Sequence, residues 1–175
     1  MTLDAPRPAQ AAKPTFAAVA EELLDDVFGY LLYLTKNRAV AEDLTGETFE
    51  AALRKWRRFD PERGTPRAWL LAIARTTALD WFRADARRKR REERAEASYL
   101  RPEPADPFGE GLSPELEAGL LSLSAGEREV VALRVVLDLD GEQVARVLGI
   151  SPTAVSTRLH RALAKLEERM RDDIA

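Results

Sequence analysis

The stretch from Pro66 to Arg91 constrains the fold most, because its two faces require different surroundings. Read as a helix, it has apolar residues on one side, at offsets of three, four and seven, and polar residues on the other. The apolar side comprises Leu70, Leu71, Ala74, Ala78, Trp81 and Phe82, and the polar side comprises Thr76, Asp80, Arg83 and Arg87, with Trp69 at its head. Thr65 suits the N-cap, and Pro66 suits the first helical position. The sequence therefore predicts a helix that packs through one face and presents the other to a large anionic partner.

Composition limits the class of protein. The 175 residues are 45% hydrophobic and 33% charged, which is typical of a soluble globular protein with one or two small domains. The sequence has no cysteine and one histidine, so we expect no disulfide, no metal site and no cofactor. It has no signal peptide and no apolar run of membrane-spanning length, so we expect a cytoplasmic protein without membrane insertion. The net charge of −3 restricts nucleic-acid contact to local patches such as Arg87 to Arg91.

Helical periodicity and turn residues divide the chain into two lobes. Residues 1–15 lack periodicity and are predicted to be a disordered lead. Residues 16–96 carry helical patterns, residues 97–112 accumulate proline, glycine and acidic side chains, and residues 113–172 are again helical. The predicted fold class is all-α, with two small helical domains joined by a flexible linker. No nucleophile and base pair, phosphate loop or metal cluster is visible, so we expect neither an enzyme nor a small-molecule substrate.

The second lobe contains clear helix-start signals. Ser124 and Asp140 are each followed three residues later by Glu or Gln, which is typical of a capping box. Gly149 precedes Ser151-Pro152, so a short turn is predicted to join two helices as a helix-turn-helix. The predicted buried side of the second helix comprises Val155, Leu159, Ala162, Leu163 and Leu166. Its predicted exposed side includes Thr153, Ser156, Thr157, Arg158, Arg161 and Lys165. Such residues suit readout of the DNA major groove, and the alternative is the solvated face of an ordinary helical hairpin.

The helix predicted for residues 40–57 carries an acidic stripe. Asp43, Glu47 and Glu50 are spaced by four and three residues, opposite an apolar face with Leu44, Thr48, Ala52, Trp56 and Phe49. The stripe is either a docking surface or a solvated face braced by an ion pair from Glu50 to Arg54. Such a pair contributes only about 0.3 kcal/mol. Energetics therefore do not decide between the two interpretations.

Two sets of motifs resemble one known family. AEDLTGETF at residues 41–49, followed by AWLLAIARTTALDWFRADARR at residues 68–88, resembles region 2 of bacterial sigma factors of the extracytoplasmic-function (ECF) type, in the sigma-70 superfamily. In the second lobe, GEREVVALRVV, GEQVARVLGIS and TAVSTRLHRALAKL resemble region 4 of the same family. The motifs occur in the family's order and together cover nearly everything from residue 16 to residue 171.

The resemblance implies a transcription initiation factor. Such a protein binds the β′ clamp helices and β flap of core RNA polymerase, recognises the −35 and −10 elements of promoter DNA and promotes strand opening. It implies polymerase contacts by the acidic stripe and −35 contacts by the exposed residues of the second helix given above. The implied −10 contacts are Phe59, Arg63, Trp69, Thr76, Asp80, Arg83 and Arg87. Phe59 and Trp69 are the aromatics that could stack on an extruded base, with core packing as the alternative for each. An anti-sigma factor is also an implied partner.

The sequence departs from the family's usual pattern at several positions. Gly46 stands where Gln is usual, which changes the implied docking surface, and Thr76 stands where Asn is common near the melted strand. Ala154 and Ser156 stand where Gly and Lys are frequent, which removes one phosphate-binding cation. Two other functions remain open at this point. One is a homodimeric helix-turn-helix regulator that acts without polymerase, and the other is a protein-interaction module that has lost contact with DNA.

Overall fold

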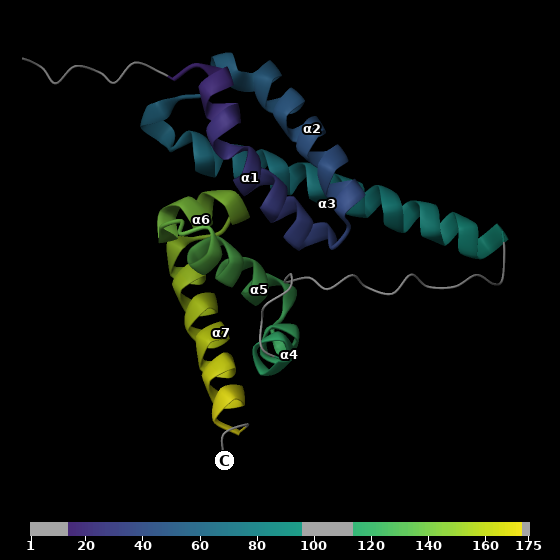
Figure 1. Ribbon diagram of the computed structural model, residues 1–175, viewed down its shortest axis with the longest axis vertical. Coiled ribbons are helices and arrows are strands. Elements are labelled where there is room, and N and C mark those ends of the chain that lie inside the picture. The colour runs from purple at the N-terminus through teal and green to yellow at the C-terminus, as the bar shows by residue number, and fades with distance from the viewer. Residues whose placement is uncertain (1–13, 96–113, 173–175) are drawn as a thin grey trace, which may run out of the picture.

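The computed structural model of the protein describes residues 14–95 and 114–172, which are helical with short connections and contain no strand (Figure 1). The first lobe consists of α1 (Phe16–Thr35), α2 (Arg38–Lys55), two short 3-10 helices (Trp56–Arg58 and Pro61–Arg63) and α3 (Pro66–Ala95). The second lobe consists of α4 (Pro114–Ser122), α5 (Ala125–Val131), a π-helical turn (Ala132–Val136), α6 (Gly141–Leu148) and α7 (Pro152–Asp172). The predicted linker and all but the last two residues of the predicted lead lie outside the described residues. No described helix is long and apolar enough to cross a membrane.

The helix starts follow from local side-chain caps. Thr65 Oγ1 accepts a hydrogen bond from the amide of Ala68 at 3.2 Å, so the predicted start of α3 at Pro66 is confirmed. In the second lobe, both predicted capping boxes are present, one begun by Ser124 before α5 and one by Asp140 before α6. Gly149 ends α6 with a φ of 66°, a left-handed conformation that glycine adopts without a steric penalty.

The first lobe is a three-helix unit in which α1, α2 and α3 pack against one another. The apolar face predicted for α3 is buried at Leu70, Leu71, Ala74 and Ala78. Phe82, however, is 37% exposed, so its predicted place in the core is wrong. Figure 1 shows that the C-terminal part of α3 projects beyond α1 and α2, so residues toward this end have fewer helices to pack against.

The predicted buried side of α7 is also mostly confirmed. Val155 and Ala162 are buried, and Leu159 and Leu166 are half-buried against α4 and α5. Leu163 is 47% exposed, which contradicts its predicted burial. One residue advances a helix by about 100°. Leu163 therefore lies outside the face that α4 and α5 cover around Ala162.

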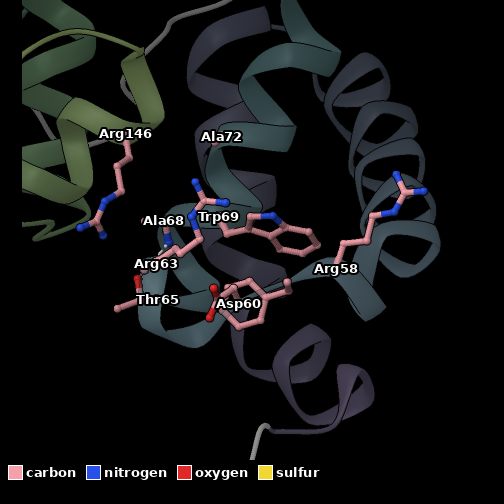
Figure 2. Close-up of a pocket in the computed structure, with 10 residues that line it drawn as sticks. Arg58, Asp60, Arg63, Thr65, Ala68, Trp69, Ala72 and Arg146 are labelled. Atoms are coloured by element: carbon pink, nitrogen blue, oxygen red, sulfur yellow. Dashed lines mark hydrogen bonds between the residues drawn. The ribbon is translucent and has the colours of Figure 1, made fainter.

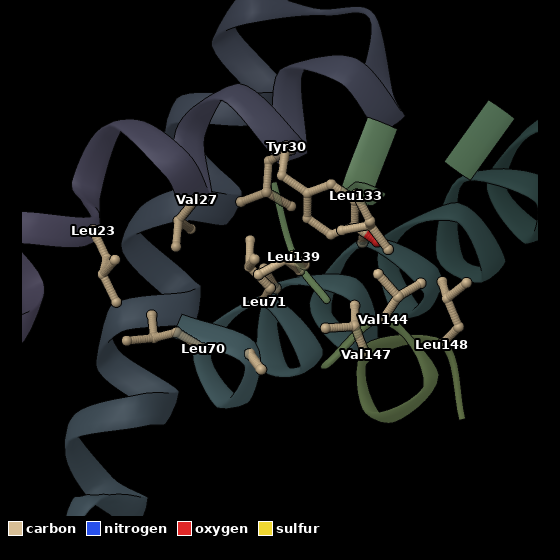
Figure 3. Close-up of a cluster of buried hydrophobic side chains, with 14 of the residues drawn as sticks. Leu23, Val27, Tyr30, Leu70, Leu71, Leu133, Leu139, Val144, Val147 and Leu148 are labelled. Atoms are coloured by element: carbon tan, nitrogen blue, oxygen red, sulfur yellow. The ribbon is translucent and has the colours of Figure 1, made fainter. Parts of the chain in front are cut away.

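The two lobes share one hydrophobic core, an arrangement that the sequence did not predict. Figure 3 shows Leu71 of α3 beside Leu139 of the second lobe, and Tyr30 of α1 beside Leu133. These four side chains are almost completely buried. Helix α6, the first helix of the helix-turn-helix, packs directly against α3. The segments predicted as separate domains are therefore in close contact in this structure.

Candidate nucleic-acid interface

An aromatic cluster forms where the turn after α2 meets the start of α3. The rings of Trp56 and Phe59 are stacked, with centroids 4.9 Å apart and planes 7° from parallel. Trp69 packs against both, at 5.7 Å from Trp56 and 5.3 Å from Phe59. Phe59 is only 6% exposed, because Trp56 and Trp69 cover its ring. Of the two interpretations of Phe59, stacking on a base or core packing, the structure shows packing: its ring supports Trp69, which is half-buried and borders a pocket.

A pocket of about 300 Å³ lies beside this cluster (Figure 2). Its polar and charged lining residues are Arg58, Asp60, Arg63, Thr65 and Arg146, and the predicted −10 residues Arg63 and Trp69 meet in it. Figure 2 shows Arg63 beside the indole of Trp69, while Arg146 reaches in from α6 of the other lobe. An aromatic wall with nearby cations is the chemistry that holds an unstacked base and its phosphates. The sequence carried no signal for Arg146, which belongs to the opposite lobe.

The other −10 candidates lie further along α3. Thr76 is exposed, and its hydroxyl donates to the carbonyl of Ala72 at 2.9 Å, a common use of Thr within a helix. The carboxylate of Asp80 accepts from Arg83 at 2.8 Å, and Arg87 is exposed one turn beyond Arg83. These four side chains therefore lie outside the pocket beside Trp69.

A second concavity, an acidic groove of about 500 Å³, separates α2 from α3. It is lined by Glu47, Glu50, Ala51, Arg54, Thr77, Asp80, Trp81 and Ala84. Asp43 is exposed one turn before Glu47, and the predicted pair from Glu50 to Arg54 is present at 3.4 Å between exposed side chains. Asp80 was predicted to contact the −10 element, but it shares this groove with two other carboxylates and is a poor ligand for phosphate. Trp81, predicted as core, is half-buried and borders the groove.

Packing does not require a glycine at position 46, where the family usually has Gln. A Cβ placed on Gly46 would meet no atom within 4 Å, and its backbone is helical. A longer side chain therefore has room here, between Asp43 and Glu47 on the exposed part of α2. Glycine at this position leaves a gap in the acidic stripe and weakens the helix by up to about 1 kcal/mol.

The N-terminal half of α7 presents most of the residues predicted to contact the −35 element. Thr153, Ser156, Thr157 and Arg161 are exposed. The hydroxyls of Ser156 and Thr157 donate to backbone carbonyls one turn earlier. Arg158 is half-buried, and its guanidinium lies 3.4 Å from the position that a Cβ on Gly126 would take. In this structure the side chain of Arg161 is therefore accessible to DNA, whereas that of Arg158 packs against α5.

Lys165 has a structural partner inside the lobe. Its ammonium donates to both carboxylate oxygens of Glu127 at 2.9 Å, and Glu127 is buried at the start of α5, where it also accepts from the amide and hydroxyl of Ser124. The hydrogen bond from Lys165 first, and then those from Ser124, lower the pKa of Glu127 to about 2. Lys165 was predicted to contact DNA. In the structure it instead ties α7 to α5, because its charge neutralises a buried carboxylate.

The Glu127 contacts predict a specific loss of stability in acid. A carboxyl whose pKa falls from 4.5 to about 2 on folding stabilises the protein in full above pH 4.5, and this contribution disappears as the pH falls toward 2. We expect Glu127→Gln to lower the free energy of unfolding at pH 7 by roughly 1–3 kcal/mol, allowing for the half-exposed Lys165. We also expect the difference from the wild type to shrink between pH 4.5 and pH 2. Urea unfolding across this range measures both effects. The control is Glu168→Gln, which changes an exposed carboxylate of α7, and a constant difference at every pH would contradict the assignment.

The comparisons with known proteins agree with the two-lobe division. Residues 19–88 match the model of sigma-70 region 2, which covers α1 to α3, and residues 114–166 match the model of sigma-70 region 4. The ECF RNA polymerase sigma factor BldN of Streptomyces coelicolor is 34% identical over 166 residues, which are 90% of this chain and 61% of BldN. The RNA polymerase sigma factor CarQ of Myxococcus xanthus is 33% identical over 162 residues, which are 85% of this chain and 90% of CarQ.

A solved structure has the same fold. It is the sigma factor RpoE in complex with the anti-sigma factor NepR from Bartonella quintana. Its TM-score is 0.70 with 23% sequence identity, and the match covers 89% of this chain and 96% of that one. At this identity, the likeness concerns the fold alone.

Proposed function

This chain belongs to the ECF type of the sigma-70 family, and we propose that it binds core RNA polymerase and directs it to promoters with −35 and −10 elements. One observation carries the proposal. A helix-turn-helix with exposed polar residues on α7 is joined in one chain to a helical lobe with an aromatic, cationic pocket and an acidic groove. Sigma factors are initiation factors rather than enzymes, so the bond-forming chemistry belongs to the polymerase.

In the proposed complex, residues 113–172 recognise the −35 element. The N-terminal half of α7 enters the major groove, where Arg161, and Arg158 once it leaves α5, can bond bidentately to guanine. Thr153, Ser156 and Thr157 supply short contacts to phosphates or to thymine methyl groups. The same lobe is the part that meets the β flap. Lys165 is left out of this set because Glu127 holds its ammonium.

Residues 16–96 recognise the −10 element and dock on polymerase. A base extruded from the non-template strand enters the pocket beside Trp69, with Arg63 near its phosphates. Unstacking costs a few kcal/mol, which stacking on an aromatic side chain can offset at about 1–3 kcal/mol per base. Thr76, Arg83 and Arg87 continue the contact along α3. Asp43, Glu47 and Glu50, joined by Asp80, form the surface for the β′ clamp helices.

The two lobes act together when polymerase holds them on one promoter. Each lobe offers modest affinity, and the attachment to polymerase turns the second contact into an intramolecular one with a high effective concentration. This accounts for a DNA-binding function in a chain whose net charge is −3. A homodimeric regulator acting without polymerase is the second candidate, and no observation in the structure favours it.

The basic end of α3 predicts a salt dependence. Arg87 and Arg90 are exposed, whereas Arg88 and Lys89 both pair with Asp85. Replacing Arg87 and Arg90 by Gln is expected to reduce the magnitude of the slope of log K for DNA binding against log salt by about 1.4 to 1.8, since each phosphate contact that forms releases about 0.7 to 0.9 counterion. Filter binding of the polymerase complex to promoter DNA from low to high salt measures the slope. Arg88→Gln is the control, for which we expect a smaller change in the slope. If the double variant leaves the slope unchanged, residues 87–91 do not contact phosphates and form only a solvated helix end.

Isolation of native complexes tests the proposed partners. Affinity capture of the full chain from its own cells is expected to recover the β and β′ subunits of core polymerase. An anti-sigma factor is the second partner that we propose, on the pattern of the family. Replacing Asp43 and Glu47 by Lys should remove polymerase from the captured material. If neither polymerase subunits nor an inhibitor is captured under any growth condition, the proposal is wrong.

A further inference from the structure

An ion pair joins the middle of α1 to the first turn of α3. The carboxylate of Asp26 accepts a hydrogen bond from Nε of Arg67 at 2.6 Å. The side chains of Asp26 and Arg67 are 29% and 32% exposed, so water and salt screen this pair less than they screen a fully exposed one. The pair therefore adds a directional contact to the apolar packing between the two helices.

Local helix chemistry does not favour a cation at position 67. Arg67 is the second residue of α3, where free backbone amides give the helix end a partial positive charge. The residues from Pro66 to Leu70 include no acidic side chain, so this turn does not supply a balancing charge itself. The carboxylate of Asp26 supplies that charge from α1. The arginine is therefore explained by its partner on α1 and not by the helix that contains it.

Trp69 lies on the other side of the same turn. Two residues advance a helix by about 200°, so Arg67 and Trp69 leave α3 in nearly opposite directions. Trp69 borders the pocket shown in Figure 2. The rings of Trp56 and Phe59 pack against its indole. The first turn of α3 is thus held on one side by Asp26 and on the other by two aromatic rings.

We propose that Asp26 and Arg67 are positioning residues for the −10 pocket, and that their ion pair fixes the first turn of α3 so that Trp69 is in place before an extruded base arrives. The inference rests on the proposed function for the identity of the pocket. A base that stacks on a side chain already held in one orientation binds more tightly, because less ordering accompanies binding. Neither positioning residue needs to touch the DNA.

Removing one base at a time from the DNA measures the contact at the pocket. The full chain bound to core polymerase is titrated with a fluorescent non-template single strand that spans the −10 element of a promoter used by that complex. In a matched set of strands, each −10 nucleotide in turn is abasic. The ratio of the dissociation constants, abasic strand over intact strand, gives the contribution of each base. Trp69→Ala identifies the position that the pocket holds, because its ratio should fall to near one there.

The wild type is expected to show a large ratio at that position. Asp26→Asn, which keeps the size of the side chain, should lower this ratio by about three- to tenfold, the range that follows from ordering one additional side chain on binding. Arg67→Gln should have the same effect. The reversed pair, Asp26→Arg with Arg67→Asp, should restore the ratio, and a negative charge at position 67 also suits the start of a helix. Ratios at the other positions should not change.

Glu167→Gln is the control, because it removes a carboxylate that pairs with Arg171 within α7 and leaves the first lobe unchanged. Three results would overturn the inference: wild-type ratios in both single variants, equal losses at every base position, or a lowered ratio that the reversed pair does not restore. Asp26→Asn decides the matter if Arg67→Gln does not fold.

The wild type distinguishes this failure from failure of the proposed function. If the wild-type complex shows one sensitive base and the variants keep it unchanged, the ion pair only stabilises the fold and the proposed function stands. If the wild-type chain does not bind core polymerase, or if its complex responds to no missing base, the proposed function itself fails.

Discussion

Asp43→Lys combined with Glu47→Lys is expected to raise the dissociation constant for core polymerase by at least about a hundredfold, which corresponds to about 2.7 kcal/mol. Both side chains are exposed, and Glu47 lines the acidic groove between α2 and α3. A surface that selects a basic partner becomes repulsive when its charges are reversed, and like charges brought together at an interface cost several kcal/mol. Titration of labelled protein with core polymerase measures the constant directly.

The matched control reverses two carboxylates elsewhere in the same lobe. Glu21 and Glu22 are exposed on α1 and lie outside the proposed surfaces, so Glu21→Lys with Glu22→Lys changes the net charge by the same amount. This control should bind polymerase within a few-fold of the wild type. Equal losses in both double variants would mean that net charge, rather than the stripe on α2, governs binding. If the variant of Asp43 and Glu47 binds polymerase as tightly as the wild type, α2 is not part of the interface.

Arg158→Ala combined with Arg161→Ala is expected to reduce transcription from promoters with an intact −35 element by at least about thirtyfold. Each arginine that bonds bidentately to guanine contributes about 1–3 kcal/mol of discrimination. The reduction should vanish on a template whose −35 element is scrambled, because the wild type has already lost those contacts there. Initiation rates on the two templates, measured with the wild type and the variant, give the coupling between these side chains and the element.

Arg169 and Arg171 provide the control for this variant. Both are exposed near the end of α7, beyond the half proposed to enter the groove, and Arg171 pairs with Glu167. Replacing both by Ala removes the same charge from the same helix and should leave the preference for the −35 element intact. An identical loss of preference in the two double variants would indicate a general electrostatic effect and contradict readout by Arg158 and Arg161.

Features that depend on a few neighbouring residues could be predicted from the sequence. The capping boxes at Ser124 and Asp140, and the cap at Thr65, need only side chains three residues apart, so their structures follow from local chemistry. Helical periodicity likewise identified most of the buried face of α3. It failed at Phe82, because periodicity does not show where the covering helices end, and at Leu163, because periodicity does not show how wide a face those helices cover.

Contacts between distant parts of the chain could not be predicted in this way. Glu129 and Arg146 are ordinary charged residues of short helices, and only the folded arrangement brings them to Arg75 and to the pocket beside Trp69. Lys165 was assigned to DNA for the same reason, since its partner Glu127 lies on another helix. Sequence patterns identify a face as polar or apolar, but they do not identify which residue opposes it.

In the proposed function, this chain gives core polymerase its promoter specificity. The most direct measurement is transcription by purified core polymerase with and without the purified protein, on a fragment library of the organism's genome, with the 5′ ends of the transcripts mapped. We expect start sites that appear only with the protein and that share one upstream pair of −35 and −10 sequences. The Asp43 and Glu47 double reversal should abolish them. If the start sites across the whole library are identical to those of core polymerase alone, this chain does not give the polymerase its promoter specificity.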